Sequence, residues 1–387
     1  MENKKLNSAI GFLLLLSITC SVFFVANVTY YCAFSAPYAR GDLDEFSFFY
    51  YPLIESDHEY YLQTIQKIKD GTPTLGFNNN AGISYLYFVI QKLFGYDNDN
   101  IVFVAFCVNS LSCLVAFFVF FKIVSFLRLP SRYSLLFFIN LGLIYSSQLI
   151  NKELLSLLLI LLMVYSVMIN KKKFMFLLIP LSMVVRLQLG LIGFLILWLD
   201  NRRRYIPSII LLYIIMSIGA ALVSIYAPGF DPEYMQDTSL GTKLVQRTYL
   251  LNQEYLIGSL ILNPVRIIQY FYDLSRSLFF IQDGLIDLYK LRDVPMIVLL
   301  VFFSKDIIFA FRKIGFYQHT VNRVLITSII VFVLVLLMNP LIHARYLFPI
   351  LPLMILLGLS VRQGRKRFQK LKQKVVPDRN IKVFQQT

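Results

Sequence analysis

The chain alternates between long apolar runs and short basic clusters along most of its length. Apolar runs of about 20 residues are long enough to cross the hydrocarbon core of a bilayer as α-helices. The first run, from about Ala9 to Tyr31, is too long for the core of a cleavable signal peptide, so it is interpreted as a retained first span. The pattern therefore predicts an all-α, polytopic integral membrane bundle.

The basic clusters order these spans, because cytoplasmic loops carry an excess of lysine and arginine. With every cluster placed inside, about ten transmembrane helices are predicted, and both the N- and C-termini are cytoplasmic. The approximate spans are 9–33, 101–123, 133–149, 154–170, 205–226, 294–311, 321–339 and 346–361, with two short spans dividing 174–199. Residues 1–362 form the predicted transmembrane domain. Residues 363–387 form a basic cytoplasmic tail that we expect to lie on anionic lipid.

Two long segments, about 36–100 and 228–293, are predicted on the outer face. Both mix aromatic with charged residues and neither is of low complexity. Stretch 61–69 spaces its leucine and isoleucine side chains like one face of a helix. We therefore expect short amphipathic helices in these outer loops, lying along the membrane surface.

Composition supports the membrane class and excludes others. Hydrophobic residues make up 57% of the chain and the mean hydropathy is +0.65, well above the usage of soluble proteins. The four cysteines fall in apolar runs, which indicates neither a disulfide framework nor a zinc site. The net charge of +15 lies mainly in the predicted inner loops and tail, so no nucleic-acid partner is expected.

Several polar side chains fall near span ends that this topology places outside. They are Asp57, Lys152, Glu153, Arg186, His343 and Arg345. Charged groups at membrane depth are costly unless they are paired or functional. Their common side therefore predicts one polar cavity that opens outward. A second interpretation stays open, in which Lys152, Arg186 and Arg345 only extend their charges to the membrane interface.

Three short motifs resemble the GT-C class of membrane glycosyltransferases, which take sugars from polyprenyl-phosphate carriers. Motif 57–61, Asp-His-Glu-Tyr-Tyr, is similar to the first outer loop of that class, where an aspartate precedes a tyrosine and a short helix. Motif 151–154, Asn-Lys-Glu-Leu, resembles the polar turn of a later hairpin. Motif 343–349, His-Ala-Arg-Tyr-Leu-Phe-Pro, resembles the Arg-Tyr-x-x-Pro start of a late span.

The resemblance implies transfer of a sugar from a polyprenyl-phosphate-linked donor to a lipid-linked or cell-surface glycan acceptor. The reaction is expected on the outer face of the cytoplasmic (inner) membrane, with inversion at the sugar. Asp57 is the expected general base, with Glu59 or Glu55 as a helper or metal ligand. Asp42 and Asp44 stay open as alternative bases, because Asp57 lies farther past the first span than the base of this class often does.

Glycosyl transfer from a lipid phosphate also needs cations for the phosphate that leaves. Arg186, Lys152 and Arg345 are the candidates, since a guanidinium group can bind phosphate through two donors, and His343 is expected to assist. The sequence is compatible with a divalent cation, magnesium or manganese, but does not require one.

Two other functions stay open. An O-antigen or capsule polymerase that uses undecaprenyl-pyrophosphate-linked repeats would rely on arginines in two outer loops. The second loop offers such arginines, at positions 247, 266, 276 and 292, whereas the first loop is acidic. A lipid-linked glycan transporter or flippase would need charges at mid-depth, for which Lys305 and Asp306 are the candidates. No convincing internal repeat supports that function.

Overall fold

The computed structural model describes most of the chain. The described residues are 2–35, 49–50, 56–71, 81–94, 101–148, 150–226, 247, 250–252, 254–282, 284–314, 320–338 and 343–375. They are mostly helical (84%), as the sequence predicts. Asp42 and Asp44, the alternative bases, lie outside the described residues, as does the tail after Val375.

Four helices in the described part are long and apolar enough to cross a membrane. They are α1 (Glu2–Tyr30, continued by the π-helical turn η1, Tyr31–Ser35), α5 (Ile101–Phe126), α10 (Tyr205–Tyr226) and α14 (Val294–Arg312). Shorter apolar helices occupy three further predicted spans: α7 (Glu153–Met168), α9 (Leu187–Asp200) and α15 (Asn322–Leu336). The helices support a membrane protein, while the count of about ten spans stays a prediction.

The predicted spans between 133 and 199 agree with the structure to different degrees. Segment 133–149 is not one helix, so this prediction is wrong. It forms the 3-10 helix η3 (Ser131–Ile139) and the short helix α6 (Gly142–Ser146). Asn140 separates them, because its side-chain oxygen accepts a hydrogen bond from the Gly142 backbone N–H (3.1 Å) and competes with helical bonding.

Segment 174–199 divides as predicted. Helix α8 (Met175–Val185) ends at Arg186, and α9 begins directly after it. The backbone of Arg186 is extended (φ −161°, ψ 120°), which turns the chain between the two short helices. The predicted break is therefore confirmed, and it places Arg186 at a junction instead of on a helix face.

Both predicted outer loops contain helices. The first holds α3 (Ser56–Lys69) and α4 (Ala81–Phe94), and the second holds α12 (Gly258–Arg276) and α13 (Leu288–Leu291). A three-stranded sheet joins the two loops, since β1 (Phe49–Tyr50) pairs in parallel with β3 (Leu285–Asp287), which pairs antiparallel with β2 (Ile281–Gln282). Strand pairing therefore connects the two predicted outer loops.

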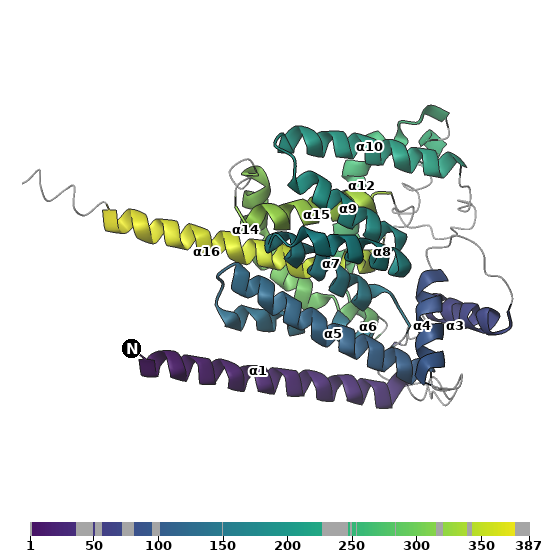
Figure 1. The fold of residues 1–387 in the computed structure, drawn as a ribbon, viewed down its shortest axis with the longest axis horizontal. Helices are drawn as coiled ribbons and strands as arrows, with labels where there is room; N and C mark the ends of the chain where they lie inside the picture. Colours follow the sequence, from purple (N-terminus) through teal and green to yellow (C-terminus); the bar gives the residue numbers. More distant parts are fainter. Residues whose placement is uncertain are drawn as a thin grey trace, which may run out of the picture.

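Most of the long helices run side by side, and α3 and α4 lie at one end of this bundle (Figure 1). The N-terminus lies at the opposite end, where the basic part of α16 (Leu351–Val375) also projects. The short 3-10 helix η7 (Ala344–Leu347) precedes α16. The boundary predicted after residue 362 falls inside α16, which continues as one helix to Val375.

Basic side chains from different predicted inner loops contact two aspartates, Asp200 and Asp306. Lys172 lies 2.8 Å from the carboxylate of Asp200, and Arg323 donates to the Asp200 carbonyl (2.7 Å). Asp306 accepts from Arg362 (2.8 Å) and Arg365 (3.1 Å), so the aspartate considered for a transporter is held in an ion cluster between α14 and α16. These contacts hold the predicted inner loops close to one another.

Candidate functional site

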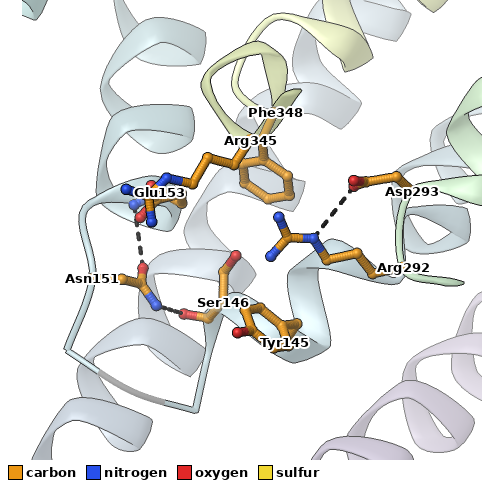
Figure 2. A pocket seen from close by; sticks show the side chains of 8 residues that line it. All are labelled: Tyr145, Ser146, Asn151, Glu153, Arg292, Asp293, Arg345 and Phe348. Carbon is orange, nitrogen blue, oxygen red and sulfur yellow. Dashed lines mark hydrogen bonds and ion pairs between the residues drawn. The ribbon is translucent and has the colours of Figure 1, made fainter. Parts of the chain in front are cut away.

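A polar pocket lies where three separate parts of the chain meet (Figure 2). It comprises about 290 Å³ of space, open solvent included. Its lining residues are Tyr145, Ser146, Asn151, Glu153, Arg292, Asp293, Arg345 and Phe348. They come from the end of α6 and the turn into α7, from the junction of α13 and α14, and from the η7 segment. All three parts are the ends of elements, where side chains can converge.

The turn before α7 is held by its own side chains. The Asn151 amide donates to the Ser146 carbonyl, and its oxygen accepts from the Glu153 backbone N–H (3.2 Å). The Glu153 carboxylate accepts from the Lys152 N–H (3.0 Å). An acidic residue in the first turn of a helix is favoured by the helix dipole. The turn therefore fixes both the carboxylate of Glu153 and the start of α7.

Two arginines from distant segments share one aromatic ring beside this carboxylate. Arg186 lies 3.7 Å from Glu153, and its guanidinium is 5.5 Å from the centre of the Tyr346 ring. The guanidinium of Arg345 lies 5.4 Å from the same ring. In Figure 2 the Arg345 side chain extends toward Glu153. The ring of Tyr346 thus contacts both guanidinium groups and helps to orient them.

The third part of the pocket supplies Arg292 and Asp293. The Arg292 guanidinium lies 4.7 Å from the centre of the Tyr145 ring and 3.5 Å from the Asp293 carboxylate. Burial raises the pKa of Asp293, and the positive charge of Arg292 opposes this shift. The Arg292 guanidinium points between the rings of Tyr145 and Phe348 (Figure 2).

Four cations converge on one carboxylate in this cluster. Arg186, Arg345, Lys152 and Arg292 all act electrostatically on the carboxylate of Glu153. The carboxylates of Glu153 and Asp293 line the pocket beside these cations, and the carboxylate of Asp273 acts electrostatically on Asp293. Lys152, Arg186 and Arg292 are buried, at 5%, 7% and 7% exposure. Cations gathered at one buried place raise the local positive potential, which attracts an anionic group.

Some of the site residues predicted from the sequence lie at this pocket, and others do not. Lys152, Arg186 and Arg345 converge with Glu153, as the predicted cavity requires. His343 is exposed and is not among the lining residues, and its ring packs edge-on against Tyr346 (5.9 Å between centres). Sequence reasoning missed Arg292 as a residue of this pocket. Its place in the arginine-containing second loop was the one available signal.

Asp57 and Glu59 lie in α3, whose backbone is described there although these two side chains are not. Helix α3 contacts the turn that carries Lys152. The imidazole Nδ1 of His58 accepts a hydrogen bond from the Ile150 backbone N–H (3.1 Å). The Lys152 ammonium lies 5.7 Å from the centre of the Tyr61 ring. The helix that carries the predicted base thus packs directly beside the cation cluster.

Over the described residues, no group of three or more His, Cys, Asp or Glu side chains could hold a metal ion. The side chains of Asp57 and Glu59 are not part of that set. Comparisons of the chain with protein-family models, with curated proteins and with solved structures find no match. The chemistry of the site is therefore argued from its own residues.

Proposed function

We propose that the protein is a membrane glycosyltransferase of the GT-C type. It would transfer a sugar from a polyprenyl-phosphate-linked donor to a lipid-linked or cell-surface glycan acceptor. The observation that carries this proposal is the convergence of four cations on Glu153, directly beside the helix that contains Asp57. An anion site next to a carboxylate-bearing helix is what glycosyl transfer from a lipid phosphate needs.

In the proposed reaction, Asp57 takes the proton of the acceptor hydroxyl group, assisted by Glu59. The hydroxyl oxygen attacks the anomeric carbon from the face opposite the phosphate. The bond from that carbon to the phosphate oxygen breaks with its electron pair, so the configuration inverts and polyprenyl phosphate leaves as a dianion.

The negative charge on the phosphate grows as the bond breaks. Arg186, Lys152, Arg345 and Arg292 are the groups that would stabilise it, because preorganised donors act most strongly where charge develops. His343 would assist from the edge of the site. A divalent cation would add further positive charge, and no step here depends on one.

The proposed location is the cytoplasmic membrane, with the pocket on the outer face and about ten spans. Two sets of contacts support this arrangement: the residues predicted outside meet at the pocket, and those predicted inside meet around Asp200 and Asp306. The N-terminus and the basic part of α16 lie at the same end of the bundle (Figure 1), which supports cytoplasmic termini and a tail on anionic lipid.

Extraction of lipid-linked saccharides from cells with and without the gene tests this function. A transferase predicts that one glycan is missing or shortened in cells that lack the gene. The purified protein in liposomes should then release polyprenyl phosphate from a sugar-loaded donor when the acceptor is added. Unchanged glycans together with no release would contradict the proposal.

A polysaccharide polymerase is the second candidate, and Arg292 favours it. That side chain comes from the second loop, whose arginines such a polymerase would use, and it lines the same pocket as Arg345. A polymerase would break a pyrophosphate-linked bond and lengthen a chain of repeats. Accumulation of single repeat units in cells without the gene would indicate this function instead.

A further inference from the structure

Helices α3 and α4 contact two of the segments that bring cations to the pocket. The Nδ1 atom of His58, at the start of α3, accepts from the N–H of Ile150, two residues before Lys152. Gly82, at the start of α4, lies so close to the α8 backbone that a Cβ atom there would be 2.0 Å from the carbonyl oxygen of Val184. Val184 lies in the last turn of α8, two residues before Arg186. The two helices thus pack against two of the cation-bearing segments.

The contact made by His58 requires a particular form of the imidazole. Its Nδ1 accepts a hydrogen bond, so the ring is neutral and carries its proton on Nε2. The side chain is 0% exposed, and this burial lowers the pKa of His58 to about 4. The acceptor is therefore maintained at neutral pH. Tyr61, one turn later on the same helix, adds the second contact to this turn, through Lys152.

We propose that His58 is a positioning residue, which holds α3 against the turn at Ile150 and so fixes the distance between Asp57 and the cation cluster. This inference rests on the proposed function, because the positioning is proposed to serve the sugar-transfer reaction. A displacement of about 1 Å between reacting groups can lower a rate by about a hundredfold. A fixed contact next to the base is a physically effective way to prevent such a displacement.

The central variants are His58→Asn and His58→Phe. The asparagine side-chain oxygen can take the place of Nδ1 as an acceptor, whereas phenylalanine fills the space without one. We expect His58→Phe to lower kcat by at least about tenfold with little change in KM for the lipid donor, because the cations are retained. We expect His58→Asn to recover most of the rate. Thr64→Val is the matched control, since Thr64 is buried on α3 but donates to its own helix, at the Tyr60 carbonyl.

Hydrogen–deuterium exchange of α3 tests the docking without any assay of activity. His58→Phe should raise amide exchange along 56–69, and His58→Asn should restore protection. Gly82→Ala should also loosen the packing of α3 and α4, at the contact of α4 with α8, because the added methyl group would clash with the backbone of Val184. Gly11→Ala is the control, because no atom lies within 4 Å of a Cβ there. These glycine variants also cover the case in which His58→Phe does not fold.

The outcomes separate this inference from the proposed function. Unchanged exchange in both His58→Phe and Gly82→Ala would overturn the docking, whatever the protein catalyses. Raised exchange with an unchanged kcat would overturn the positioning role. If the wild-type protein shows the docking but transfers no sugar, the proposed function is wrong, and the positioning role in that reaction is lost with it.

Discussion

Arg186 lies 3.7 Å from the carboxylate of Glu153, with side chains that are 9% and 12% exposed. An arginine that only extends its charge to the membrane interface would keep its guanidinium in water. Arg186 instead turns toward a carboxylate and the ring of Tyr346 inside the protein. This geometry favours a binding function over membrane anchoring, and the following predictions test it.

Arg186→Lys and Arg345→Lys should each lower turnover by at least about tenfold, which corresponds to about 1.4 kcal/mol, with normal protein levels. Lysine retains the charge but cannot reproduce the planar two-donor contact or the stacking on Tyr346. The measurement is the rate of sugar transfer by the purified variants in liposomes.

The matched control for these variants is Arg132→Lys. Arg132 also lies over an aromatic ring, that of Tyr133 (5.7 Å), but belongs to a predicted inner loop. Its replacement should leave turnover unchanged. If Arg186→Lys and Arg345→Lys both retain full activity, the two arginines act as membrane anchors and the anion site loses its main support.

Glu153→Gln should lower the thermal midpoint of the purified protein, with a loss of stability of roughly 1–3 kcal/mol. The change removes the charge of the carboxylate on which four cations act, so less of the repulsion among these cations is offset. Inorganic phosphate or pyrophosphate should raise the midpoint of the variant more than that of the wild type, because the anion replaces the missing charge.

Asp200→Asn is the control for this measurement. Asp200 also pairs with a cation, Lys172, but that lysine side chain is 33% exposed, and such pairs contribute little. A midpoint that neither falls in Glu153→Gln nor responds to phosphate would argue against an anion site.

The helices were largely predictable because apolar runs are local features of the sequence. The break at Arg186 followed from an apolar stretch too short for two full spans and bounded by basic clusters on both sides. Segment 133–149 was mispredicted because its apolar content is high, whereas the helix is interrupted at Asn140, whose side-chain oxygen accepts a hydrogen bond from the Gly142 N–H. A hydropathy pattern cannot predict a single hydrogen bond between a side chain and the backbone.

The pocket was predictable only in part. Topology alone placed Lys152, Glu153 and Arg345 on one side of the membrane, and the structure brings them together. Arg292 lies in a long loop where no periodicity indicates which side chain turns inward. Its contact with Tyr145 depends on packing between segments far apart in the sequence. The contact between His58 and Ile150 is of the same kind.

Cysteine labelling at Asn79 and at Lys172 should report opposite sides of the membrane. The first position lies in the predicted outer loop and outside the described residues, and the second pairs with Asp200 among the predicted inner contacts. The measurement uses a reagent that cannot cross the membrane, applied to intact cells and then to opened ones. Labelling of both positions from the same side would contradict the topology and the outward-facing pocket.

Asp57→Asn should leave the protein folded and inserted but abolish sugar transfer. Its backbone lies in α3, next to the His58 contact that docks this helix at the pocket, so the base would be held beside the cations. Loss of a general base typically lowers a rate by a factor of about 10² to 10⁴. Asparagine has nearly the same shape but cannot accept the proton.

Asp70→Asn is the matched control, because Asp70 follows the same helix at its far end and accepts from Gln66 (3.0 Å). Normal glycan from Asp57→Asn cells would exclude Asp57 as the base, and Asp42 and Asp44 would then be replaced in turn.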